Sequence, residues 1–421
     1  MKIGYSFWGF LGDKKMDKNF NILSTPDGNA FYSWCIIREL QRDGFTCVSI
    51  MPDRDKYWYE YCEYGRENAV HPYSEYAFGA WCTVDRTKAY ELMEKTDYSL
   101  FDGTKESLYK IWLSQGYDSL SFILHEWRME IIGRNDKETM GRYFNGELID
   151  FQPDYFIQEC LIDFCADYNI PLIIFDLDYK LSEDMFVKLL EINKETYLLE
   201  LGFKWSRKYG YSTVDHIYHV EIPFDFDYMY AYPHLLNAGI EYNLIYVGNR
   251  YERDWCIDKY IPQDLSYVKV YGNWLESGRD SKDRWPNIDF GGRLQTYDMM
   301  DVYSSSVATI LLAKEEYCKY SFMTARILEA IFYGTIPLFI EEYGKDTIEK
   351  YAGIYAEFLT VRNKEDVKEK INILRHDMVV RFYILKYLKN HLSFMDVRNF
   401  IKVLYNCIGY EGGRLYGLYV K

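Results

Sequence analysis

The sequence predicts an α/β protein made of two doubly wound, Rossmann-like domains that face a central cleft. Three observations favour this fold class. The chain has 421 residues, enough for two or three domains, and 48% of them are hydrophobic. Its first half opens with a strand, a helix and a second strand, the usual start of a doubly wound sheet. After a break at Ile222-Pro223-Phe224, the second half begins a strand pattern of its own.

The first half is predicted to build one sheet with its helices, over residues 1–225. Lys2–Phe7 is expected to be a strand, and the helix Asn29–Arg42 follows the turn Thr25-Pro26-Asp27-Gly28. A second helix is expected at Met185–Leu190. The other predicted strands are Phe45–Met51, Leu120–Leu124, Asp154–Gln158 and Pro171–Phe175.

The second half is predicted to build another sheet, over residues 226–394. Its helix Phe322–Tyr333 has apolar residues at helical spacing, and the tail from Lys364 is mostly helical. The predicted strands are Asn243–Val247, Tyr267–Tyr271, Val307–Leu312 and Ile336–Ile340.

The composition excludes several classes of protein. The net charge of −15 argues against a protein that coats nucleic acid, although a local basic cleft is compatible with it. Nine cysteines without a C-x-x-C pair indicate reduced thiols in a cytoplasmic protein. No apolar run approaches the ~18 residues of a membrane span, and we expect no signal peptide because Gly4 and Gly9 interrupt the first residues. The 43 tyrosines suit clefts and interfaces, but codon usage in an A/T-rich genome explains them equally well.

Candidate site residues follow the predicted strands, because ligands of open α/β sheets bind at the carboxyl ends of the strands. His125 and Glu126 come directly after one strand of the first half. Two strands of the second half end in Gly248-Asn249-Arg250 and Gly272-Asn273-Trp274. Glycine at such an end lets the backbone approach a ligand closely.

The segment from Arg326 to Phe339, with the sequence RILEAIFYGTIPLF, is the most informative stretch. Glu329 lies near the start of a helix that Gly334 ends, and a carboxylate there suits two hydroxyl groups of a ribose. A surface glutamate in an ordinary helix–turn–strand unit is the alternative. The segment resembles the donor-binding segment of GT-B nucleotide-sugar glycosyltransferases. The resemblance implies that Glu329 holds the nucleotide ribose, with Arg326 in the same donor site.

The resemblance has further implications. It implies the GT-B fold, a nucleotide-sugar donor that is most simply a UDP-sugar, and C-terminal helices 395–421 that pack back on the first domain. It also implies that no metal is required. Many retaining members have a second glutamate eight positions before the first, where this chain has Ser321. Retention or inversion therefore stays open.

A second resemblance concerns the acceptor. Leu124–Asn135, Phe175–Lys180 and Tyr246–Tyr251 are similar to segments of phage glycosyltransferases that modify hydroxymethylated pyrimidines in DNA. This resemblance implies a phage protein in the bacterial cytoplasm that acts on double-stranded DNA. The acceptor-binding residues expected from these segments and from the first loop are Trp8, Arg128, Arg134, Asn135, Asp176 and Asp178.

Sugar transfer needs a base for the acceptor hydroxyl and donors for the leaving diphosphate. We expect Glu126 to be the base, with His125 as the second choice; a structural ion pair of Glu126 with Arg128 or Arg134 is the alternative. The resemblance makes Arg250 the diphosphate contact, with Arg253 and the close-approach glycines Gly248 and Gly272 beside it. The alternative is an ion pair of Arg250 with Glu252 or Asp254.

Asp176-Leu177-Asp178 has the D-x-D form of a metal site. Alternate residues of a strand face opposite ways, so we expect these acids to shape the cleft or cap a helix instead. The basic residues near Lys14, Lys204 and Arg279 suit DNA phosphates, although solvated surface patches are the alternative. A base in duplex DNA would have to be flipped out to react. The rival functions are a transferase for a cell-surface polysaccharide, spore component or protein, and a non-catalytic sugar-nucleotide or glycan-binding module.

Overall fold

The structure is a computed structural model, and it describes residues 1–6, 29–50, 100, 102, 104–127, 154–176, 179, 181–205, 216–227, 239–275, 281–292, 294 and 299–410. These residues divide into two compact units. Unit 1 contains the described residues up to Pro223 and those from Val397 onward, and unit 2 runs from Phe224 to Asp396.

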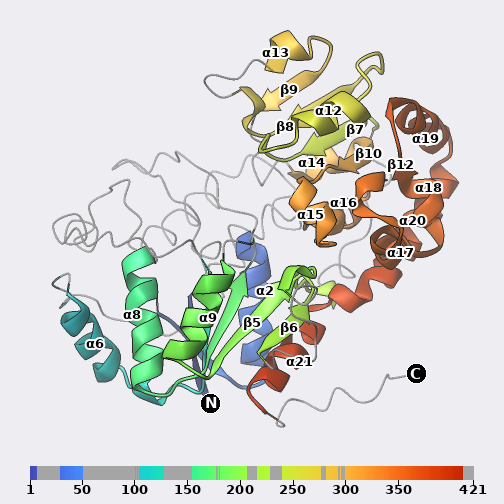
Figure 1. Ribbon diagram of the computed structural model, residues 1–421. Helices are drawn as coiled ribbons and strands as arrows, with labels where there is room; N and C mark the ends of the chain where they lie inside the picture. The colour runs from blue at the N-terminus through green and yellow to red at the C-terminus, as the bar shows by residue number, and fades with distance from the viewer. Residues whose placement is uncertain are drawn as a thin grey trace, which may run out of the picture. The chain divides into compact units, whose positions relative to one another are not determined.

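Unit 1 is a parallel sheet of six strands in the order β2-β1-β3-β4-β5-β6 (Figure 1). Its strands are β1 (Lys2–Ser6), β2 (Thr46–Ser49), β3 (Ile123–Glu126), β4 (Leu172–Asp176), β5 (Thr196–Leu201) and β6 (Ile217–Val220). Its helices are α2 (Asn29–Arg42), α6 (Lys105–Ser114), α8 (Asp154–Asp167), α9 (Glu183–Ile192) and α21 (Val397–Cys407). The central strands β3 and β4 are buried along their whole length, as expected for parallel strands covered on both faces.

The helices of unit 1 form two layers. Helices α8 and α9 contact each other and cover the near face of the sheet in Figure 1. Helices α2 and α21 pack together on the far face, where Phe400 of α21 lies edge-on to Phe175 of β4. The chain thus returns to unit 1 through α21, whose Tyr405 stacks on Phe45 and donates a 2.7 Å hydrogen bond to Asp43.

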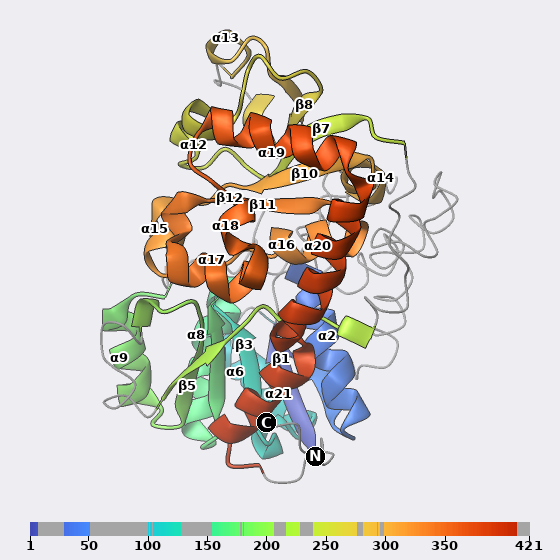
Figure 2. The same cartoon turned by 90° about the vertical axis from the view of Figure 1, so that its right-hand side faces the viewer.

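Unit 2 is a second parallel sheet of six strands, in the order β12-β11-β10-β7-β8-β9. Its strands are β7 (Tyr242–Val247), β8 (Val268–Tyr271), β9 (Asp289–Gly292), β10 (Ser306–Leu311), β11 (Ile336–Ile340) and β12 (Thr360–Val361). Its helices are α12 (Asp254–Tyr260), α13 (Ser281–Arg284), α14 (Met299–Ser304), α15 (Glu315–Lys319), α16 (Arg326–Tyr333), α17 (Lys345–Ala352), α18 (Ala356–Leu359), α19 (Lys364–His376) and α20 (Met378–His391). Figure 2 shows α19 above β11 and β12, and α16 and α17 below them.

The sequence predictions for several elements are confirmed, and one is wrong. Helix α2 and strand β11 have the predicted bounds, and Gly334 ends α16 with a left-handed backbone, φ 85°. Asp154–Gln158 is not a strand but the first part of α8. Its aromatic and β-branched residues favour a strand locally, whereas the apolar residues of the whole segment pack as one buried helix. Strands β5, β6, β9 and β12 were missed; β9 ends in two glycines, and β12 has two residues.

Among the described residues, no helix is both long and apolar enough to cross a bilayer.

Candidate functional site

Each sheet has a switch point, where successive connections leave the first strand in opposite directions. In unit 2 the chain runs from β7 to β8 and β9, and then starts again with β10 on the other side of β7. In unit 1 the same reversal lies between β1 and β3. Ligands of open α/β sheets bind in the crevice at the carboxyl ends of the strands at such points. The groups at the β7/β10 edge are therefore candidate site residues of unit 2, and those at the β1/β3 edge are candidate site residues of unit 1.

The loops after β7 and β8 hold each other in place. The side-chain oxygen of Asn249 accepts from the backbone N–H of Asn273 (3.2 Å), and that of Asn273 accepts from the N–H of Arg250 (2.8 Å). The indole of Trp274 donates to the carbonyl of Gly248 at 2.7 Å. A Cβ on Gly272 would lie within 3.0 Å of that carbonyl, so only glycine fits this contact. We call this pair of loops, residues 248–250 and 272–274, the asparagine clasp.

Helix α16 brings Arg326 and Glu329 to the switch point of unit 2. The Arg326 guanidinium donates to the carbonyl of Val247 and lies 5.5 Å from the ring centroid of Tyr246. It packs so tightly over Gly248 that a Cβ there would lie within 3.0 Å of it. The Glu329 side chain, 9% exposed, accepts a 3.1 Å hydrogen bond from the hydroxyl of Tyr303. A carboxylate and a guanidinium thus share the first turn of one helix.

Arg253 is a second buried cation at this edge, with only 4% of its surface exposed. Its hydrogen bonds go to the backbone carbonyls of Asn249 (3.3 Å) and Tyr251 (3.0 Å), and its Nε has no acceptor among the described residues. Burial raises the pKa of the Tyr343 phenol while Arg326 and Arg253 both act to lower it, so both guanidinium groups lie near this ring. Neither arginine forms an ion pair with a carboxylate of the described part of the chain. Their positive charge therefore favours an anion.

Arg250 has different surroundings, on the β8 side of the loop. It makes a two-pronged ion pair with Asp254 (2.7 and 2.6 Å) and lies 5.4 Å from the ring centroid of Trp285. Arg284 also donates to Asp254, at 2.8 Å. Arg250, Asp254 and Arg284 border an open pocket of about 700 Å³. The ion pair with Asp254 is the alternative left open by the sequence, and it occupies the Nε–Nη2 edge of the Arg250 guanidinium that a diphosphate would use.

The carboxyl edge of the sheet in unit 1 carries buried polar groups. His125 is 2% exposed, and its Nε2 lies 2.7 Å from Oε1 of Gln158 on α8. Glu126 is also buried and lies beside Phe175 in the sheet register, so it shares the face that α21 covers. The two candidate bases therefore point to opposite faces of β3. His125 lies beside Ser6 of β1, directly at the switch point.

Asp176, at the end of β4, is also buried, and its carboxylate accepts from the backbone N–H of Leu181 (3.1 Å). It thus links the end of β4 to Leu181, two residues before α9. The other predicted acceptor residues lie outside the described part of the chain, namely Trp8, Arg128, Arg134, Asn135 and Asp178. In the described ranges, no three histidine, cysteine, aspartate or glutamate side chains form a metal site.

Sequence reasoning missed the partners that orient the predicted residues. Tyr303 lies 26 residues before Glu329, and Gln158 lies 33 residues after His125. Gln158 carried no signal, because it fell in the segment expected to be a strand. Asn249 and Asn273 did carry one, since both follow a glycine at a strand end.

Comparison with known proteins identifies the fold. No protein-family model matches the chain, and no curated protein sequence matches it. Solved structures do match, and they show that the chain has the GT-B fold of nucleotide-sugar glycosyltransferases. T4 phage β-glucosyltransferase, solved with UDP and Mn²⁺, is 13% identical with a TM-score of 0.57, over 97% of this chain and 99% of that one. HepE of Anabaena, solved with UDP, is 10% identical with a TM-score of 0.52, over 97% of this chain and 100% of that one.

Proposed function

We propose that the chain is a glycosyltransferase that moves a sugar from a UDP-sugar to an acceptor hydroxyl. The observation that carries the proposal is the switch point of unit 2, where Arg326 and Glu329 share the first turn of α16 and the buried Arg253 contacts the loop that follows Gly248. A nucleoside diphosphate needs this combination of a ribose acceptor and phosphate donors. The T4 phage enzyme and HepE, which share the fold, were both solved with UDP and with UDP-glucose.

The donor-site residues have distinct proposed roles. Glu329, oriented by Tyr303, accepts hydrogen bonds from the ribose hydroxyls. Arg326 and Arg253 neutralise the diphosphate, and Gly248 and Gly272 leave room for it. We propose that Arg250 does not contact the diphosphate directly, since its guanidinium is already paired with Asp254. A donor site that needs no metal is part of the proposal.

The transfer step follows from these roles. A base on unit 1 takes the proton of the acceptor hydroxyl, and the acceptor oxygen bonds to the anomeric carbon of the sugar. The bond between that carbon and the diphosphate oxygen breaks, and UDP leaves with the electron pair. Charge develops on the sugar ring and on the diphosphate, where the arginines stabilise it.

Glu126→Gln is expected to lower kcat by about 10²- to 10⁴-fold, the usual contribution of a general base. The substitution keeps the shape of the side chain and removes only its basicity. Steady-state kinetics with a UDP-sugar, together with UDP titration by calorimetry, measure the effect; the affinity for UDP should stay unchanged because unit 2 binds it.

His125→Asn is the matched comparison. A loss confined to His125→Asn would assign the base to His125, at the β1/β3 switch point, and refute the role of Glu126. Unchanged kcat in both variants would refute the whole assignment in unit 1.

We further propose that the acceptor is a 5-hydroxymethylpyrimidine in phage DNA. The resemblance of the LHEWR and YVGNRY segments supports this acceptor, and the T4 phage enzyme of the same fold is a DNA-modifying enzyme. Because the chain is acidic overall, with a net charge of −15, binding to DNA is expected to be local and sensitive to salt.

The experiment is mass spectrometry of nucleosides from hydroxymethylated duplex DNA incubated with the protein and a panel of UDP-sugars. A sugar added to the modified pyrimidine, but not to unmodified DNA, is the expected result. Gel shifts between about 50 and 200 mM salt test the duplex contact. Donor turnover without DNA labelling would direct the search to a polysaccharide, spore component or protein acceptor. UDP binding without any turnover would show a binding module.

A further inference from the structure

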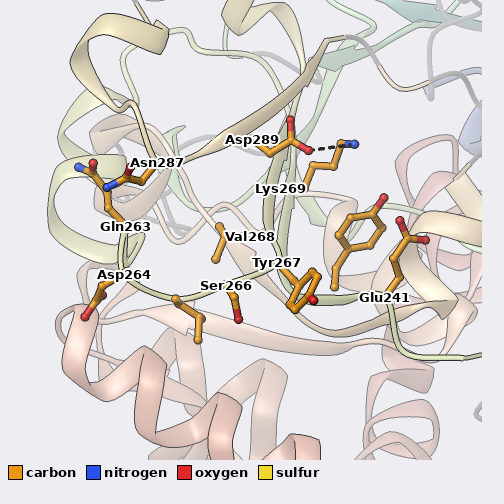
Figure 3. A pocket seen from close by; sticks show the side chains of 11 residues that line it. Glu241, Gln263, Asp264, Ser266, Tyr267, Val268, Lys269, Asn287 and Asp289 are labelled. Atoms are coloured by element: carbon orange, nitrogen blue, oxygen red, sulfur yellow. Dashed lines mark ion pairs between the residues drawn. The ribbon is translucent and has the colours of Figure 1, made fainter.

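A groove of about 620 Å³ opens at the amino edge of the sheet in unit 2 (Figure 3). It lies at the starts of β7, β8 and β9, whereas the asparagine clasp lies at the opposite ends of β7 and β8. In Figure 3, Gln263 and Asn287 lie at one end of the groove and Glu241 at the other, with Tyr267 between them. The volume falls within the ~300–1,000 Å³ of small-ligand sites.

Tyr267 presents its ring to solvent from a rigid backbone. Its side chain is 63% exposed, and its φ of 58° lies in the left-handed region that a tyrosine rarely adopts. Asn243 fixes this conformation, because its backbone N–H donates to the carbonyl of Tyr267 and its side chain donates to that of Ser266, both at 2.9 Å. Arg375 in turn donates to the side chain of Asn243. The backbone that carries this exposed aromatic ring is therefore held in a strained conformation, and such strain concentrates at ligand sites.

The charges around the groove are compensated within the protein. Lys269 pairs with Asp289 at 3.2 Å and lies 5.6 Å from the ring centroid of Tyr242, and Asp264 pairs with Lys368 at 2.9 Å. Burial raises the pKa of Tyr242, and a hydrogen bond to Glu241 raises it further. Three carboxylates around one ammonium disfavour a phosphate or a nucleic acid. Because the carboxylates already have partners, the groove does not call for a cation either.

We propose that this groove binds a neutral saccharide. A pyranose offers an apolar C–H face for the ring of Tyr267 and hydroxyl groups at its rim. The amides of Gln263 and Asn287 and the carboxylate of Asp289 supply donors and acceptors for those hydroxyls. The site is separate from the donor loops, so it would hold a sugar-bearing product or acceptor while the donor site stays accessible.

The test is saturation-transfer NMR and calorimetry of the full chain with three neutral hexasaccharides: maltohexaose, cellohexaose and laminarihexaose. At least one is expected to bind, and Tyr267→Gly is expected to weaken it at least tenfold. Glycine suits φ 58°, so this variant relaxes the backbone instead of straining it. Tyr267→Trp keeps an aromatic face and should retain binding.

Tyr383→Ala is the matched control, since Tyr383 on α20 is similarly exposed and lies away from the groove. UDP titration should give the same affinity in all of these variants, which separates this proposal from that of the donor site. Failure of all three hexasaccharides to bind at about 10 mM, tenfold above a weak Kd of about 1 mM, would overturn the proposal. Binding that Tyr267→Gly leaves unchanged would overturn it as well.

Discussion

Glu329→Gln is expected to weaken UDP binding by about 10- to 100-fold. The variant keeps the size of the side chain and its place on α16 but removes the negative charge that accepts the ribose hydroxyls. Hydrogen bonds to a charged group are worth about 1.5–3 kcal/mol, and each 1.4 kcal/mol is tenfold in affinity. Calorimetric titration with UDP and with uridine measures the change, and both ligands should weaken together because both contain the ribose.

Two further variants make this result specific. Glu349→Gln on α17 removes an exposed carboxylate with a loose 3.6 Å ion pair, and it should leave UDP affinity unchanged. Arg253→Lys should weaken UDP but not uridine, since its proposed contact is the diphosphate. Equal UDP affinity in Glu329→Gln and the native chain would remove Glu329 from the donor site.

Gly272→Ala is expected to destabilise unit 2 by about 4 kcal/mol. A Cβ at this position would lie within 3.0 Å of the carbonyl of Gly248, and the φ of 133° is one that alanine rarely adopts. Backbone strain of this kind costs about 1–3 kcal/mol, and overpacking costs about 1–3 kcal/mol more. Urea unfolding followed by circular dichroism measures the loss.

Gly292→Ala is the matched control, because Gly292 also has a positive φ (73°) but open space around its would-be Cβ. Gly292→Ala should cost only the free energy of placing an alanine in the left-handed region, about 1–2 kcal/mol. Equal stability of the two variants would show that the loop at Gly272 does not pack as closely against the carbonyl of Gly248 as described.

Much of the fold could be predicted because it depends on local signals. The helix Asn29–Arg42 and the strand Ile336–Ile340 have the bounds that their apolar spacing and flanking turns indicate. The prediction of a strand at Asp154–Gln158 was wrong because a short run of aromatic and β-branched residues suits either a strand or a helix. The packing of the whole segment decides between the two.

The candidate site could be predicted only in part, for a related reason. Gly248, Gly272 and Glu329 lie at strand ends and helix starts, which the sequence marks. Whether Arg250 contacts a ligand or Asp254 depends on the direction of a side chain, and either outcome fits the same residues. Partners distant along the chain, such as Tyr303 for Glu329, become visible only when the strands are placed next to one another.

The asparagine clasp has a consequence for how the protein can change. The side chain of each asparagine accepts a hydrogen bond from the backbone of the other loop, so a movement of one loop requires a movement of the other. Losing either amide leaves the opposite loop with a backbone N–H that has lost its acceptor. Positions 249 and 273 are therefore energetically coupled, and a substitution that one loop tolerates depends on the residue present in the other.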